Sequence, residues 1–138
     1  MDENKLVELL NEALQREYTD VFLYPRYADT IKEKEISETF KRFALMELRH
    51  ADNIAMQIHI LRGKPHWEFT PLKTKESLHE MVREHIEREK SALSLYSKLI
   101  EFVEKEEGYE QLKLILRGIK SEEASHLKAM NELAEKVK

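Results

Sequence analysis

The stretch ISETFKRFALMELRHADNIAMQIHIL, residues 36–61, decides the fold, because its apolar residues recur every three or four positions. This period is typical of a helix that turns one face toward the inside of a bundle. Near the middle of that face, Glu47 and His50 interrupt the apolar series. The stretch therefore predicts a long core helix that carries a carboxylate and an imidazole inward.

The same helical period continues through most of the chain. Only three glycines and three prolines occur, and the composition, rich in Glu, Lys, Leu and Ala, favours long helices. We expect four helices, over residues 3–32, 36–62, 75–105 and 109–136. Ser77 and Glu80 form a predicted capping box at the start of the third helix.

The connections between these helices predict the topology. Short turns at 32–35 and around Gly108 indicate two antiparallel hairpins. Pro65 and Pro71 exclude a helix from residues 63–74, and twelve extended residues reach about 40 Å, the length of a helix of about 27 residues. We therefore predict an all-α fold, a ferritin-like four-helix bundle in which a long crossover joins two antiparallel hairpins, as one domain over residues 1–138. Trp67 and Phe69 are expected to pin the crossover to the bundle.

Composition excludes several classes of protein. A net charge of −4 and an isoelectric point near 5.9 argue against binding to nucleic acid or to an anionic membrane. The chain has no cysteine, which excludes disulfides, thiolate catalysis and cysteine-ligated metals. Because the first residues are polar and no long apolar run occurs, we expect no signal peptide, no membrane span and a cytoplasmic location.

A glutamate interrupts the inward-facing positions of every predicted helix near its middle. These residues are Glu17, Glu47, Glu89 and Glu123, and His50 and His126 follow the second and the fourth by three residues. Residues at one level of an antiparallel hairpin are equidistant from its turn. The first two glutamates are centred on residue 32 and the last two on residue 106, so we expect all four in one layer.

Four carboxylates in a dry core require protons, cationic partners or metal ions, because each is costly to desolvate. Two divalent ions would balance the four charges. One glutamate from each of two helices, with Glu-x-x-His from the other two, is the ligand set of di-iron and di-manganese carboxylate proteins. The donor types suit Fe, Mn or Zn. The alternative is a metal-free bundle with a polar layer.

The motif Glu-x-x-His alone is weak evidence, since the chain contains three copies. The third copy, Glu76 and His79, lies off the inward-facing positions, and we expect it to face solvent.

Four further residues lie near the predicted layer. Tyr24 and Tyr96 each follow a predicted ligand by seven residues, which indicates an internal repeat. They either hydrogen-bond the ligand carboxylates, quench radicals or pack in the core. His85 is either a partner of Glu89, an additional ligand or a core histidine. Asp20 either steers a ligand histidine or lies at the edge of the inward-facing positions.

Nearly the whole chain resembles the ferritin-like di-iron carboxylate superfamily, and most closely the rubrerythrin di-iron domain. The segments that carry the resemblance are EALQREYTDVFLY (12–24), ELRHADNIAMQIHILRGKP (47–65), EREKSALSLY (87–96), EKEEGYEQL (104–112) and EEASHLKAMNEL (122–133). The resemblance implies two iron ions held by the six residues Glu17, Glu47, His50, Glu89, Glu123 and His126. It further implies that Glu47 and Glu123 bridge the ions and take part in catalysis.

The resemblance implies a non-haem di-iron oxidoreductase that reduces peroxide or O2. Rubrerythrins carry a cysteine-ligated rubredoxin-like domain, so this cysteine-free chain is expected to receive electrons from an external donor protein. The additional glutamate of the third helix in rubrerythrins is replaced by Ala92, and the haem-binding methionine of bacterioferritins by Leu48, so no haem is expected. A homodimer is expected; the alternative functions are iron storage and a metal-free structural bundle.

Overall fold

The computed structural model describes residues 1–137, which form four long helices. Their bounds are α1 Glu3–Thr30, α2 Lys34–Ile60, α3 Leu78–Val103 and α4 Glu110–Lys136. The predicted helices agree with these bounds to within three residues. Asp2 caps α1 and Ser77 caps α3, each accepting a hydrogen bond from the backbone N–H three residues later.

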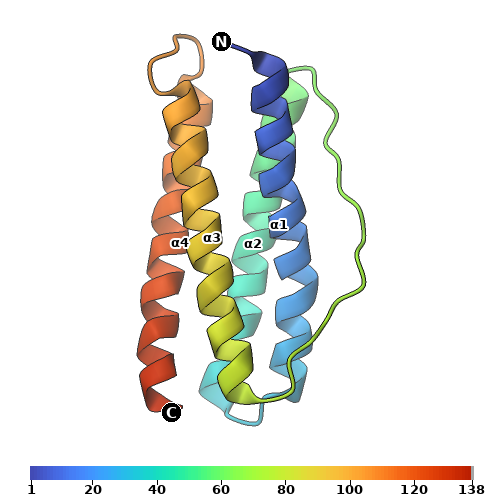
Figure 1. Ribbon diagram of the computed structural model, residues 1–138, viewed down its shortest axis with the longest axis vertical. Coiled ribbons are helices and arrows are strands. Elements are labelled where there is room, and N and C mark those ends of the chain that lie inside the picture. The colour runs from blue at the N-terminus through green and yellow to red at the C-terminus, as the bar shows by residue number, and fades with distance from the viewer. Residues whose placement is uncertain (138) are drawn as a thin grey trace.

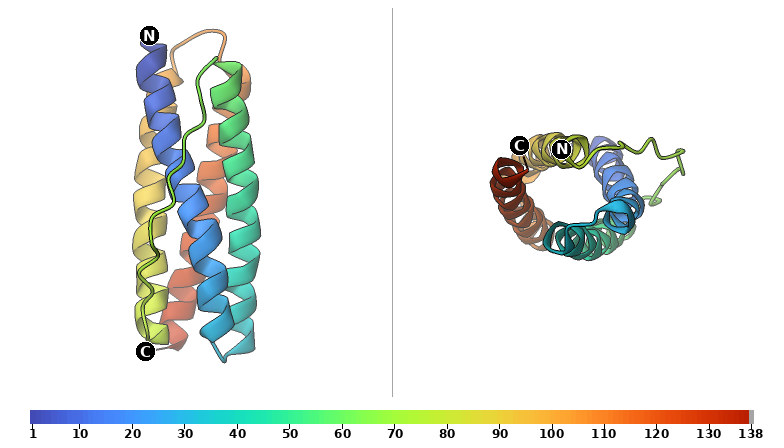
Figure 2. Two further views of the ribbon diagram at one scale, coloured as in Figure 1. Left: turned by 90° about the vertical axis from the view of Figure 1, so that its right-hand side faces the viewer. Right: turned by 90° about the horizontal axis from the view of Figure 1, so that it is seen from below.

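The helices form two antiparallel hairpins, α1–α2 and α3–α4, which lie side by side (Figure 1). The end-on view in Figure 2 places the helices at the corners of a bundle, where α1 contacts α3 and α2 contacts α4. The predicted all-α four-helix bundle with a long crossover is confirmed. None of the helices over residues 1–137 is long and apolar enough to span a membrane.

The crossover, residues 61–77, contains no helix and runs along the outside of α1 from one end of the bundle to the other (Figures 1 and 2). Two amides on successive turns of α1 hold its backbone. Asn11 accepts from the N–H of His66 at 2.6 Å and donates to the carbonyl of Lys64 at 3.1 Å. Gln15 makes the same pair of bonds with Glu68, both at 2.9 Å. The crossover thus follows a track of two side-chain amides, Asn11 and Gln15, that was not predicted from the sequence.

Aromatic contacts add to this attachment, as predicted for one of two residues. Trp67 lies against Tyr18 and Phe22, with ring centroids 5.2 and 5.4 Å apart. Phe69 was expected to have the same role, but it is 64% exposed and reaches only the edge of the Trp67 ring. In an extended chain, side chains two positions apart are expected on the same side, so the sequence predicted one role for both rings. This alternation is only approximate in the crossover, and Phe69 turns toward solvent.

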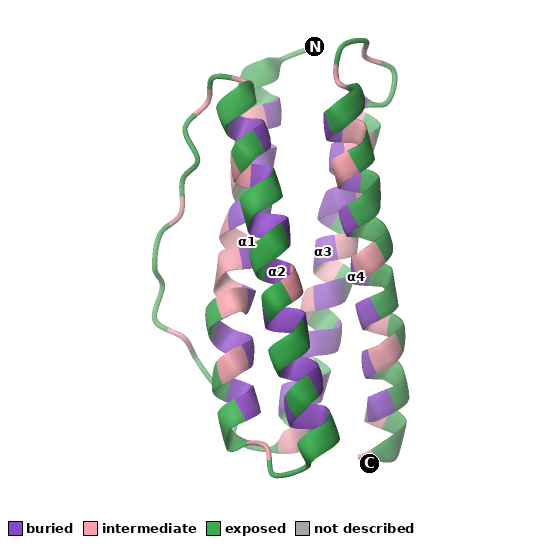
Figure 3. Cartoon of the chain, turned by 180° about the vertical axis from the view of Figure 1, so that it is seen from behind, coloured by how far each residue is buried: buried purple, intermediate pink, exposed green. Residues whose placement is uncertain are grey.

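Buried apolar side chains form two separate clusters, one toward each end of the bundle. The cluster near the N-terminus includes Leu6, Leu10, Ile54, Leu99 and Leu116. The other includes Tyr24, Tyr27, Phe40, Val82 and Met130. Figure 3 shows the buried positions on the inward sides of the helices and the exposed ones facing out. The gap between the two clusters is filled by polar side chains.

Candidate metal centre

The layer between the two apolar clusters consists of six polar side chains from all four helices. They are Glu17, Glu47, His50, Glu89, Glu123 and His126. Each is at most 3% exposed. The structure therefore brings together all six residues that the sequence singled out, because their helices place them at the same height.

The six side chains divide into two groups, each able to surround a cation. One group is Glu17, Glu47, His50 and Glu123, and the other is Glu47, Glu89, Glu123 and His126. Within each group the potential ligand atoms all lie within 4.8 Å of one another. Glu47 and Glu123 belong to both groups, so the two groups are adjacent and share two carboxylates.

Both histidines turn the Nδ1 atom toward the carboxylates. Nδ1 of His50 lies 2.9 Å from Glu123 and 3.3 Å from Glu17. Nδ1 of His126 lies 3.5 Å from Glu47 and 4.0 Å from Glu89. The same ring atom therefore points inward in the two halves of the bundle, as a metal ligand in each group requires.

Burial sets the protonation of the layer in the absence of a cation. It raises the pKa of Glu17, Glu47 and Glu89, and the neighbouring carboxylates raise that of Glu47 further. Burial also opposes ionisation of Glu123, but close contacts with Glu89 and His50 lower its pKa to about 2. The metal-free layer thus stays close to neutral by holding protons, which a bound cation must displace.

Many polar atoms of the layer have no hydrogen-bond partner among the described residues. They include both carboxylate oxygens of Glu47, Glu89 and Glu123 and the Nδ1 atoms of His50 and His126. Buried polar atoms are almost always paired in folded proteins. Carboxylate oxygens and imidazole nitrogens are suitable donors for iron, manganese or zinc. The layer therefore fits a dinuclear metal site.

Tyr96 and Tyr24 differ in what they contact. The hydroxyl of Tyr96 donates to Glu17 Oε1 at 2.9 Å, so Tyr96 fixes the orientation of that carboxylate. The hydroxyl of Tyr24 has no partner among the described residues, and its ring stacks on His85 at 4.4 Å. Nε2 of His85 lies 3.2 Å from Glu89. Because burial lowers the pKa of His85 to about 3, this ring is neutral.

Asp20 forms an ion pair with Arg88 of α3. The sequence left open whether Asp20 steers a ligand histidine or lies at the edge of the inward-facing positions. In the structure its carboxylate contacts the guanidinium of Arg88. Arg88 itself was missed, because its position beside Glu89 is at the edge of the inward-facing residues. Its long side chain nevertheless reaches across to α1, where it neutralises a charge close to the layer.

The residues on the outer side of the two histidines were also not predicted from the sequence. Glu122 lies 3.4 Å from Nε2 of His50, and the Met46 sulfur lies 3.1 Å from Nε2 of His126. Each of these residues directly precedes a Glu-x-x-His motif. Their shared position before the two copies of the motif was the feature of the sequence that could have identified them as neighbours of the histidines.

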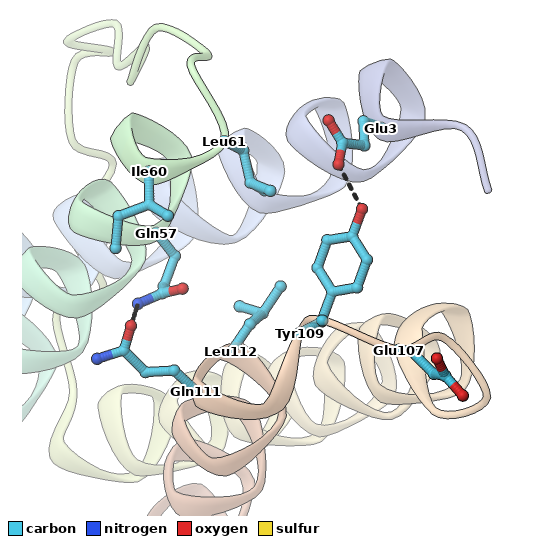
Figure 4. A pocket seen from close by; sticks show the side chains of 9 residues that line it. Glu3, Gln57, Ile60, Leu61, Glu107, Tyr109, Gln111 and Leu112 are labelled. Atoms are coloured by element: carbon cyan, nitrogen blue, oxygen red, sulfur yellow. Dashed lines mark hydrogen bonds between the residues drawn. The ribbon is translucent and has the colours of Figure 1, made fainter.

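Two other features lie away from the layer. Glu76 and His79 are exposed, as expected for the third copy of the motif. Figure 4 shows a surface pocket at the end of the bundle near the N-terminus, where Tyr109 donates to Glu3 and Gln57 contacts Gln111. Fourteen residues of α1 separate Glu3 from Glu17, or about 20 Å, so this pocket is separate from the metal centre.

Comparisons with known proteins agree with this architecture. The family model described as Rubrerythrin matches residues 8–134. No curated protein matches the chain.

Two bacterioferritins are among the similar solved structures. That of Desulfovibrio desulfuricans, described with its diiron site in different catalytic states, is 24% identical with a TM-score of 0.86, over 96% of this chain and 79% of that chain. That of Rhodobacter capsulatus, described with a metal-free dinuclear site and haem iron, is 24% identical with a TM-score of 0.87, over 98% of this chain and 86% of that one. At this identity the two structures show a shared fold.

Proposed function

Since the chain belongs to the rubrerythrin family, we propose that it is a non-haem di-iron oxidoreductase that reduces peroxide or O2. The observation that carries the proposal is the pair of buried groups that share Glu47 and Glu123. Two ferrous ions would supply two electrons to the oxidant. For hydrogen peroxide, two electrons and two protons yield two molecules of water, and an external donor protein returns the electrons.

The six side chains divide the work of holding the two ions. Glu17 and His50 belong to one group only and would hold one ion, and Glu89 and His126 belong to the other group and would hold the second. Glu47 and Glu123 belong to both groups and would contribute ligands to both ions, so they are the residues on which the reaction should depend most. Four carboxylates balance the charge of two divalent ions, so no further counter-ion is required in this water-poor layer.

The surrounding residues keep this ligand set in place and free of competing charge. Tyr96 holds Glu17 by its hydroxyl, which limits the rotamers of that carboxylate. His85 packs between Tyr24 and Glu89 as a neutral ring. Arg88 is paired with Asp20, which balances its charge.

The test is metal content together with turnover. Protein purified after growth with iron is expected to contain two iron ions per chain, and aerobic addition of Fe(II) to metal-free protein should produce a ferric absorption band. Peroxide should be consumed when a reductant is supplied. Glu47→Ala or Glu123→Ala should abolish binding of two ions while circular dichroism stays helical. Absence of bound metal and of the ferric band would refute the proposal in favour of a structural bundle.

A second candidate function is iron storage, because the fold also matches bacterioferritins closely. A very large particle in size-exclusion chromatography, filled with many iron ions per chain, would favour storage.

For the oxidoreductase we propose a homodimer instead. Four large apolar residues are exposed along one face of α2 and support such an interface: Leu45, Leu48, Met56 and Ile60. Light scattering distinguishes the two assemblies.

A further inference from the structure

The two histidines of the metal centre occupy matching positions in the two hairpins but have different surroundings. Nε2 of His50 faces Glu122 of α4 at 3.4 Å. Nε2 of His126 faces the thioether sulfur of Met46 of α2 at 3.1 Å. Glu122 and Met46 each precede a Glu-x-x-His motif by one residue, so the internal repeat places a carboxylate in one half and a sulfur in the other.

The carboxylate beside His50 is itself anchored. Nη2 of Arg49 lies 2.6 Å from Glu122 Oε2, and the Glu122 side chain is 33% exposed whereas the His50 side chain is 1% exposed. The ion pair therefore lies on the Nε2 side of the imidazole, between α2 and α4. The corresponding position in the other half is Ser125, which has no charge to hold a partner in place.

An aromatic ring packs against the second histidine. The ring of Phe43 stacks on His126 at 4.0 Å, with the planes 21° apart. The residue at the position of Phe43 in the other half is Ile119, which is buried and has no ring. His126 is thus flanked by an aromatic ring and a sulfur, whereas Nε2 of His50 has no hydrogen-bond partner among the described residues and lies 3.4 Å from the Glu122 carboxylate.

This difference bears on how strongly each ring binds a cation through Nδ1. A neutral imidazole that ligates through Nδ1 carries its proton on Nε2. A carboxylate that accepts this proton makes the ring more basic and fixes its orientation, and loss of such a partner typically weakens metal binding 10- to 100-fold. A thioether is a weak acceptor. We infer that the two metal positions are unequal: the position of Glu17 and His50 binds first and tightly, and that of Glu89 and His126 binds second and exchanges readily.

This inference rests on the proposed dinuclear site and adds an order of loading, with Glu122 and Met46 as positioning residues. Calorimetric titration of the metal-free protein with Mn(II), which requires no turnover, measures the two binding steps and so the order of loading. Wild-type protein is expected to bind two ions in two steps whose dissociation constants differ by about 10-fold or more. His126→Ala should retain the tight step, and His50→Ala should lose it.

An exchange of the two outer partners tests the cause. Glu122→Met should weaken the tight step by about 10- to 100-fold, and Glu122→Gln, which keeps an acceptor, should restore part of the loss. Met46→Glu should tighten the weak step by about 10-fold. The matched control is Asn53→Glu, which adds the same charge at an exposed position of the same helix and should leave both steps unchanged.

Each result has a defined meaning. Two equal steps in the wild type, or an equal effect of Asn53→Glu and Met46→Glu, would overturn the inference while leaving the dinuclear site intact. Absence of Mn(II) and Fe(II) binding would refute the proposed function and the inference with it. If Glu122→Met loses its helical circular dichroism, Met46→Glu alone decides the matter, because its weak step either tightens or does not.

Discussion

The apolar ends of the bundle and its polar middle layer are equally buried, but burial stabilises the first and is costly for the second. In the clusters around Leu99 and Phe40, side chains are buried because water is excluded from apolar surface, and this burial stabilises the fold. In the layer, the polar atoms of Glu47 and Glu123 are equally buried but lack hydrogen-bond partners among the described residues. The apolar clusters therefore stabilise the packing of the helices, and this packing keeps the ligand side chains of the layer together.

The comparison teaches that burial alone does not identify the role of a residue. Leu99 and Glu47 are both 0% exposed. Removing the Leu99 side chain creates a cavity, whereas replacing the Glu47 side chain takes buried polar atoms without hydrogen-bond partners out of the core when no metal is bound. Four predictions test this contrast.

The largest expected effect is that of metal on stability. At concentrations about a thousandfold above the dissociation constant, two bound ions should raise the free energy of unfolding by about 8 kcal/mol. For a chain of this size the melting temperature rises by about 20 °C. Calorimetry before and after chelation measures the shift. The double variant Glu47→Ala and Glu123→Ala should show none, and a shift that persists in this variant would place the ions elsewhere.

The next effect concerns the apolar ends. Leu99→Ala should lower the free energy of unfolding by about 2–5 kcal/mol, because the cavity near the centre of its cluster cannot collapse fully. Urea denaturation measures the change. Since ten residues of α3, or about 15 Å, separate Leu99 from Glu89, the folded variant should still bind two ions. Loss of metal binding would show that the clusters and the layer are not independent.

A substitution in the layer should change the free energy of unfolding of the metal-free protein in the opposite direction to Leu99→Ala. Glu47→Leu replaces a buried carboxyl with an apolar side chain of similar size and should raise the free energy of unfolding by about 1–4 kcal/mol. Denaturation of chelated samples measures this, and the same variant should lose two-ion binding. Destabilisation of the metal-free protein would instead mean that Glu47 is satisfied by partners within the layer.

The smallest effect is expected outside both regions. Glu76→Ala and His79→Ala alter the third Glu-x-x-His copy, which is exposed. Stability should change by no more than about 0.5 kcal/mol, and metal stoichiometry should stay the same. Reduced metal binding in either variant, measured by elemental analysis, would break the contrast between the motif in the layer and the same motif in solvent.

Much of this architecture was predictable because it depends on periodicity within single helices. The interval between Glu47 and His50 places both on one face, and the distances of the glutamates from the turns predict their common height. The amide track of Asn11 and Gln15 was not predictable in the same way. It depends on which side of α1 the crossover takes, and this choice is made by contacts between segments about 53 residues apart.

The surroundings of the ligands were harder to predict for a related reason. Arg88, Glu122 and Met46 lie at the edges of the inward-facing positions, where a rotation of the helix by a few degrees decides whether a side chain meets a neighbour or solvent. The sequence contains their identities and their positions in the repeat. It does not contain the angle at which the two hairpins face each other.

By itself, the sequence determined four helices, two hairpins, a long crossover and a level at which glutamates replace apolar residues, because local hydrogen bonding and a fixed helical period govern all of these. Only the tertiary structure decided that Glu47 and Glu123 are common to both groups, that Tyr96 holds Glu17, and that the two histidines have unlike partners. These relations arise from the packing of one hairpin against the other, where long-range contacts set rotation and register.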